Sequence, residues 1–134
     1  MKLAKNWIVS FIGLFLMTFI WHNLILSDFY VKNLVDIGRY VNGTFTPLMA
    51  FLAIGNILAA LGFAVMIPAA AKKSSDFVLY GFVMGLAVTG AFAMFSHAIF
   101  WGWTTNLMWA DLSYGILSGI IMGWILSLMN KSNS

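Results

Sequence analysis

The sequence predicts an all-α integral membrane protein, a bundle of four spanning helices with both chain termini in the cytoplasm. Three observations predict this fold class. First, 62% of the 134 residues are hydrophobic, only 8% are charged and the mean hydropathy is +0.94, which is far outside the range of soluble domains. Second, four stretches supply the roughly 20 apolar residues that one spanning helix needs. Third, most Lys and Arg residues lie at one side of these stretches, which predicts the orientation of the chain. We treat residues 1–134 as one transmembrane domain.

Four ranges are predicted to span the membrane, namely residues 6–26, 47–67, 77–100 and 107–129. The first range follows Lys2 and Lys5, as in a signal peptide, but no small-residue cleavage site follows it, and we therefore expect a retained helix. Pro47 suits the first turn of the second span, and Pro68 is expected to end that span. The tight turn WGWTTN joins the third and fourth spans.

The segment between the first two spans is predicted to be an amphipathic helix over residues 28–41. It lies at the membrane interface or extends the first span. Its charged residues fall on one helical stripe, formed by Asp28, Lys32, Asp36 and Arg39, while Phe29, Tyr30 and other apolar residues occupy the rest of its surface. Gly38 and then Asn42-Gly43 are expected to end this helix.

The positions of the basic residues predict the orientation. Five of them lie on one side of the predicted spans, namely Lys2, Lys5, Lys72, Lys73 and Lys131. Only Lys32 and Arg39 lie on the other side. Because cytoplasmic loops carry the excess of basic residues, we expect both termini in the cytoplasm.

Two classes of function are excluded or disfavoured by composition. The chain has no cysteine, which excludes disulfides, thiolate catalysis and metal sites built on thiolates. The net charge of +3 does not indicate nucleic-acid binding, because the basic residues are scattered at helix ends and form no continuous face.

Small residues recur every four positions on the last two spans. Gly115, Gly119 and Gly123 form such a ridge on the fourth span, and Gly81 and Gly85 begin a similar stripe on the third. Membrane helices associate through close contact between small side chains, since lipid gives them no hydrophobic reason to associate. We therefore expect these two spans to pack as a tight antiparallel hairpin.

Polar residues that can titrate are predicted to meet near the outer membrane surface. Asp111 lies four residues before Gly115 and should face the helix interface. His22 and His97 lie at a similar height near the outer ends of the first and third spans. We expect these three side chains to form a cluster, whose further candidate members are Thr18, Asn56, Ser96 and Tyr114.

This cluster has two interpretations. Membrane bundles often contain a few hydrogen-bonded polar residues that only hold helices together, and Tyr114 would equally suit an interfacial aromatic belt. Alternatively, an ionisable group inside the membrane marks a functional site, where two imidazoles and a carboxylate could bind a metal, hold a haem iron or relay protons. The two histidines have no spacing typical of a metal motif, so we assign no metal site, and the cofactor stays open.

Four stretches carry a resemblance to a known family: IWHNLILSDFY, GFAVMIPA, YGFVMGL and GWTTNLMWADLSYGILSG. Over nearly its whole length the chain resembles the domain-of-unknown-function family 2177, small four-span bacterial membrane proteins, with the neighbouring family 1761 as a second candidate. The positions that fit the family pattern are Trp21, Phe29-Tyr30, Pro68, Gly102-Trp103, Asp111 and Gly115. Thr18 and Phe92-Ala93 depart from it where acidic residues are expected. The resemblance implies a four-span helical fold and a location in the bacterial inner membrane, but it implies no reaction.

We therefore expect a small membrane protein that acts as a binding or accessory module within a membrane assembly. Its partners would be the lipid bilayer and other membrane proteins or a second copy of the chain, and not nucleic acid. One alternative is an enzyme or cofactor carrier that acts on a lipid-like substrate through His22, His97 and Asp111. A transporter is less favoured, because the sequence has neither an internal repeat nor a broken span.

Overall fold

The computed structural model describes residues 1–38, 40–42, 44–46 and 48–130 of the chain. It confirms an all-helical membrane fold, in which four helices are long and apolar enough to cross a bilayer: Lys2–Ile25, Met49–Ala70, Ser74–Ile99 and Thr105–Asn130. Each lies within a few residues of its predicted span, because long apolar stretches leave a membrane segment little freedom other than a helix.

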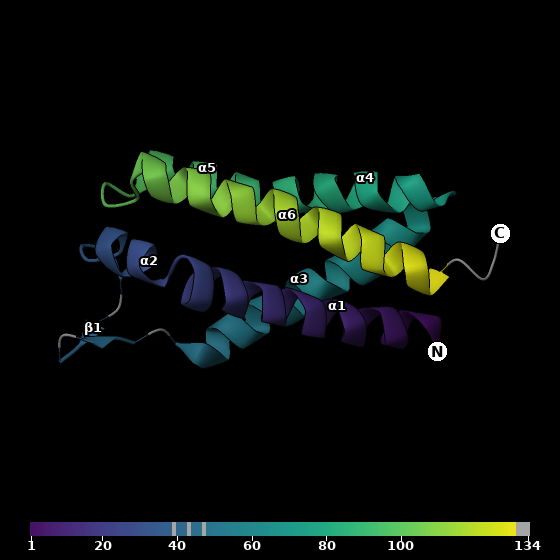
Figure 1. The fold of residues 1–134 in the computed structure, drawn as a ribbon, viewed down its shortest axis with the longest axis horizontal. Helices are drawn as coiled ribbons and strands as arrows, with labels where there is room; N and C mark the ends of the chain where they lie inside the picture. The colour runs from purple at the N-terminus through teal and green to yellow at the C-terminus, as the bar shows by residue number, and fades with distance from the viewer. Residues whose placement is uncertain (39, 43, 47, 131–134) are drawn as a thin grey trace.

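The elements follow one another as an up-and-down bundle. The first crossing consists of α1 (Lys2–Phe19) and a π-helical turn, η1 (Ile20–Ile25), and is followed by the short α2 (Ser27–Asn33) and a small hairpin of β1 (Tyr40–Val41) and β2 (Thr44–Phe45). The later crossings are α3 (Met49–Ala70), then α4 (Ser74–Gly85) with a second π-helical turn, η2 (Leu86–Gly90), and α5 (Ala91–Ile99), and finally α6 (Thr105–Asn130). Figure 1 shows the start of α1 and the end of α6 at one end of the bundle, the termini end, and α2 with the hairpin at the other, the hairpin end.

The glycine ridges bring α4 and α6 into backbone contact, as predicted. A Cβ atom added to Gly85 would lie less than 3.0 Å from the carbonyl group of Gly115, and one added to Gly119 would collide with the carbonyl oxygen of Gly81. The ridge ends at Gly123, where an added Cβ would meet the backbone of Phe77. Any side chain at these positions would separate the two helices, so the spacing of the glycines determines this pair.

The other close pair is α1 with α3, which run side by side in Figure 1. The Trp7 indole on α1 donates a hydrogen bond of 3.2 Å to the carbonyl of Ile57 on α3. Both pairs share one apolar core in the half of the bundle toward the termini end. Its buried residues are Leu14, Ala60, Phe63, Ile67, Phe77, Met122 and Leu126.

The connecting segment differs from the predicted amphipathic helix over residues 28–41. The helix ends at Asn33, whose side chain bonds back to the carbonyl of Phe29 at 2.9 Å, and turns cover residues 34–38. Asn42 then adopts a left-handed backbone with φ of 50° between strands in which Val41 pairs with Thr44. An Asn-Gly pair favours a two-residue hairpin turn, and this local preference prevails over the helical charge stripe.

Proline also acts differently from the prediction. Pro68 lies inside α3, which continues to Ala70, because a proline near a helix end removes one hydrogen bond without forcing the chain to stop at once. The two π-helical turns were not predicted either. The interpretations that involved Arg39, Gly43, Pro47 and Lys131 concern positions outside the described residues.

Candidate functional site

Asp111 is held inside the hairpin end of the bundle by a tyrosine from the connecting segment. The carboxylate lies on α6 and is only 7% exposed. The hydroxyl of Tyr30 on α2, itself 6% exposed, donates a hydrogen bond of 2.5 Å to its Oδ1 atom. Such a short bond to a carboxylate is charge-assisted and strong. The acid is therefore satisfied by protein and does not face lipid.

The end of α6 that carries Asp111 is fixed by two contacts of one threonine. The Thr104 hydroxyl accepts the N–H of Leu107 at 3.2 Å, which satisfies one of the free donors at the start of the helix. The same hydroxyl donates to Asn33 at 3.3 Å. Because Asn33 is the last residue of α2, these contacts hold α2 beside α6 and so bring Tyr30 to Asp111.

His22 lies in η1 and approaches the same carboxylate. Its Nδ1 atom is 2.9 Å from the carbonyl oxygen of Thr18, and its Nε2 atom is 3.9 Å from Oδ1 of Asp111. A carbonyl oxygen only accepts, so Nδ1 carries a hydrogen. Neutral His22 then presents a bare Nε2 to Asp111, whereas protonated His22 presents an N–H.

Aromatic rings enclose the His22 imidazole. The ring of Tyr30 lies 4.4 Å away, centroid to centroid, and the ring of Tyr114 lies 5.4 Å away in an edge-on arrangement. These contacts limit rotation of the imidazole. π-Helical turns are frequent at functional sites, and η1 is the turn that presents His22 to Asp111.

A second group of hydrogen bonds lies one turn deeper. The Tyr114 and Thr18 hydroxyls are 2.6 Å apart. The Thr18 hydroxyl lies 2.8 Å from the carbonyl of Leu14 and 3.2 Å from Oδ1 of Asn56. Since Thr18 has one hydrogen to donate and two acceptors, Tyr114 supplies the donor between the two hydroxyls. We name Thr18, His22, Tyr30, Asn56, Asp111 and Tyr114 the polar cluster.

Tyr30 is a permanent donor in this cluster. Burial raises the pKa of its hydroxyl well above the ordinary value of 10.0, and the hydrogen bond and negative charge of Asp111 raise the pKa further. Both causes favour the neutral phenol over the phenolate. The Tyr30 hydroxyl is therefore held in its neutral form, which donates to Asp111.

The deeper part of the polar cluster borders a cavity of about 230 Å³ between the four crossings. Thr18, Asn56 and Tyr114 line it with hydrogen-bonding groups. Its walls also include Phe51 and Leu52, which are 70% and 44% exposed at the bundle surface. In a bilayer these two side chains face lipid, so the cavity lies next to the lipid-facing surface of α3.

The structure brings together most of the predicted cluster but does not bring His97 into it. His97 lies on the exposed face of α5, where its Nδ1 atom is 2.7 Å from the carbonyl oxygen of Trp103. The buried positions of α5 are Ala93 and Ser96. One residue along a helix turns the side chain by about 100°, so His97 lies off the buried face that Ser96 occupies. Its contact with the Trp103 carbonyl links α5 to the following turn instead.

Among the residues that the structure describes, no group of three or more His, Cys, Asp and Glu side chains could hold a metal ion. The suggested pair of imidazole ligands for a metal or haem iron is also not formed, because His97 points away from His22. Sequence reasoning missed Tyr30, which was assigned to the apolar surface of the connecting helix. A tyrosine in such a position needs a partner for its hydroxyl when it is buried, and this was the available signal.

Residues 3–128 match the model of the domain-of-unknown-function family 2177, described as a predicted membrane protein. The chain belongs to this family. The match confirms the resemblance and covers all four crossings of the bundle, including every residue of the polar cluster. Comparisons with curated proteins and with solved structures gave no match.

Proposed function

We propose that this family 2177 protein is a membrane-embedded binding module for a lipid-like molecule. The observation that carries the proposal is the cavity of about 230 Å³ that Thr18, Asn56 and Tyr114 line beside the lipid-facing side chains of α3. Sites for whole small molecules usually measure about 300–1,000 Å³. This one suits part of a molecule, such as the ester, amide or hydroxyl group of a lipid whose chains remain in the bilayer.

The hydrogen-bonding groups match such a polar group. Asn56 keeps a second amide hydrogen beyond the one that bonds the Leu52 carbonyl, and the Tyr114 hydroxyl can turn its hydrogen from Thr18 to a bound oxygen. In the bilayer interior no water competes for these groups, and lipid chains offer them no hydrogen bonds. A bound oxygen would therefore supply hydrogen bonds that lipid chains cannot. The proposed setting is the bacterial inner membrane with both termini in the cytoplasm, and further membrane proteins or a second copy are the proposed partners.

Binding can be tested with a photoreactive lipid analogue added to the full-length protein in nanodiscs. We expect cross-links on α1, α3 and α6 around the cavity, and a strong loss of them in Thr18→Val and Tyr114→Phe, which remove only hydroxyl groups. The matched control is Tyr80→Phe, a tyrosine that packs against the apolar core and does not line this cavity. Equal labelling of Tyr114→Phe, Tyr80→Phe and the unchanged protein would reject the proposal.

A second candidate is a membrane enzyme that uses the pair of His22 and Asp111. One observation favours it: the hydrogen on Nδ1 is fixed by the Thr18 carbonyl, which leaves Nε2 free to exchange a proton next to the Asp111 carboxylate at 3.9 Å. A general acid or base needs such a defined proton position. The test is conversion of an added lipid substrate by the reconstituted protein, with loss in both His22→Gln and Asp111→Asn. If both variants keep full turnover, the pair has no catalytic role.

A further inference from the structure

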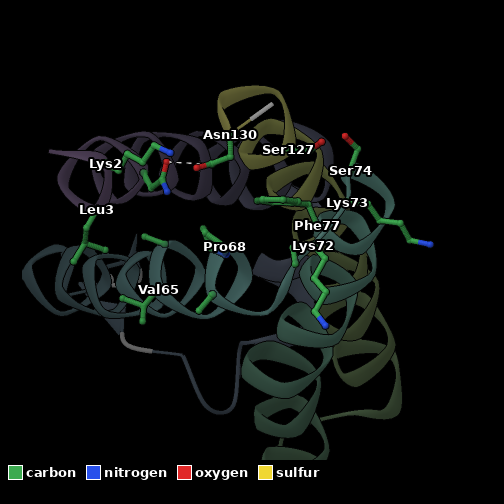
Figure 2. Close-up of a pocket in the computed structure, with 14 residues that line it drawn as sticks. Lys2, Leu3, Val65, Pro68, Lys72, Lys73, Ser74, Phe77, Ser127 and Asn130 are labelled. Carbon is green, nitrogen blue, oxygen red and sulfur yellow. Dashed lines mark hydrogen bonds between the residues drawn. The ribbon is translucent and has the colours of Figure 1, made fainter. Parts of the chain in front are cut away.

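A second and larger cavity lies at the termini end of the bundle, away from the polar cluster. Its volume is about 480 Å³, and α1, α3, α4, α6 and the turn between α3 and α4 line it. Figure 2 shows it as an open space between α1 and the end of α3. Since the helices end here, the cavity lies at the depth of lipid headgroups when the bundle spans a bilayer.

Among the described residues, three basic side chains and no acidic one line this cavity: Lys2, Lys72 and Lys73. In Figure 2 Lys2 lies on the opposite side from Lys72 and Lys73, whose ammonium groups point outward. A lysine ammonium sits on a flexible four-carbon stem, so both can turn toward an anion. The nearby Asp76 carboxylate does not line the cavity, and its Oδ2 atom accepts the backbone N–H groups of Lys72 and Lys73 at 3.0 and 3.2 Å.

Neutral polar groups from α1 and α6 also line the cavity. Asn130 donates through Nδ2 to the side-chain oxygen of Asn6 at 3.4 Å and to the carbonyl of Leu126 at 2.8 Å. Asn6 is 5% exposed and Ser127 is 4% exposed, so both are fixed in the wall of the bundle. Together they give the cavity amide and hydroxyl groups that an anion's oxygens can contact beside the lysines.

The remaining walls are apolar. Ala64, Val65, Pro68 and Phe77 line the cavity, and Val65 is 43% exposed at the lipid-facing surface. The cavity therefore combines basic and hydrogen-bonding groups, which lie on two opposite sides, with apolar walls that reach the bilayer at Val65. A soluble anion would use only the polar groups, whereas a phospholipid would use the apolar walls as well.

We propose that this cavity binds a phosphate-bearing anion, through Lys72 and Lys73 with Lys2, Asn6 and Asn130 on the opposite side. Basic pockets between membrane helices near the membrane surface are typical sites for anionic lipid headgroups. The shared chemistry is a phosphate group, which either an anionic phospholipid or a free phosphate can supply. This inference does not depend on the function proposed for the polar cluster.

The test uses two arms with the full-length protein in a phosphate-free detergent. In the first arm, native mass spectrometry measures bound phosphatidylglycerol, with phosphatidylcholine as the neutral comparison. In the second arm, inorganic phosphate alone is titrated and its binding is followed by phosphorus NMR. Binding in the first arm assigns a lipid, binding in the second assigns a free phosphate, and either supports the site if the variants below respond.

The variant Lys72→Gln/Lys73→Gln should weaken binding by roughly 30-fold, since each basic residue near a membrane surface contributes roughly fivefold to the binding constant. The matched control Lys32→Gln changes an exposed lysine of α2 at the hairpin end and should have no effect. Lys72→Arg/Lys73→Arg should keep binding. Val65→Trp, at an exposed lining position, should block the lipid without changing any charge.

Two results would overturn the inference. One is absence of saturable binding in both arms. The other is a loss in Lys72→Gln/Lys73→Gln no larger than that in Lys32→Gln, which would mean that the anion is attracted by the net charge of the protein alone. Circular dichroism of each variant separates a lost site from a lost fold, and the arginine variant keeps the test valid if the glutamine variant unfolds.

Discussion

Replacing Gly119 by alanine should destabilise the bundle, although alanine is the better helix former. An added Cβ would lie 3.0 Å from the carbonyl carbon of Gly81 and 3.1 Å from Cα of Gly85, and closer still to the carbonyl oxygen of Gly81. Ordinary contacts to a Cβ begin at 3.4 Å. All three atoms belong to the backbone of α4, so no side chain can rotate away and the two helices must move apart.

The magnitude follows from this movement. Overpacking of a close interface by one carbon costs about 1–3 kcal/mol, and α4 and α6 would lose contact along the whole ridge. The matched control is Gly55→Ala in α3, where an added Cβ meets nothing within 4 Å. Both changes gain up to about 1 kcal/mol from helix propensity. The difference between the two variants therefore isolates the steric cost.

The assay is reversible unfolding in mixed micelles with increasing denaturing detergent, followed by circular dichroism. We expect the midpoint to fall for Gly119→Ala and to stay level or rise for Gly55→Ala. If both variants unfold at the same midpoint, the contact between α4 and α6 is not the close backbone packing described above.

Three further outcomes are expected. Tyr30→Phe should lower the unfolding free energy by about 1–3 kcal/mol, because it leaves the buried Asp111 without its donor. His97→Ala, at an exposed position, should change the unfolding free energy by less than about 0.5 kcal/mol. Similar losses in both variants would contradict the assignment of the site. Because the pKa of Tyr30 is raised above its unfolded value of 10.0, its contribution to stability is fully present below about pH 10 and is lost as the pH rises above that value. The pH midpoint of alkaline unfolding, monitored by phenolate absorbance, should therefore differ between Tyr30→Phe and the unchanged protein. Ser10→Ala should raise the unfolding free energy by up to about 1 kcal/mol, since the fully buried Ser10 hydroxyl has no hydrogen-bond partner among the described residues. A clear fall in the unfolding free energy would reveal a hidden partner.

The sequence predicted the bundle and its closest helix pair because both depend on patterns within single helices. Glycines four residues apart share one face wherever the helix is placed, so Gly81, Gly85 and Gly119 could be assigned to an interface without knowledge of the fold. Depth along the membrane was equally accessible, since the direction of each crossing and the rise per residue determine it. Asp111 and His22 were brought together by this reasoning.

The same reasoning could not give the direction in which a side chain points between elements. His97 lies one residue away from the buried Ser96, and that single step turns it outward. Tyr30 was predicted on the apolar surface of the connecting helix and not in the polar cluster, because its contact with Asp111 requires α2 to fold back against the start of α6. The hairpin of β1 and β2 was also missed, although Asn42 and its neighbour carried a local turn signal.

What the sequence alone determined is the number of crossings, their approximate limits and the glycine contact between α4 and α6, because apolar length and small-residue spacing act within one segment at a time. What only the tertiary structure decided is which polar groups meet. The docking of α2, the π-helical turn around His22 and the rotation of α5 each depend on contacts between segments far apart in the chain, and these contacts bring Tyr30, His22 and Asp111 together and leave His97 outside.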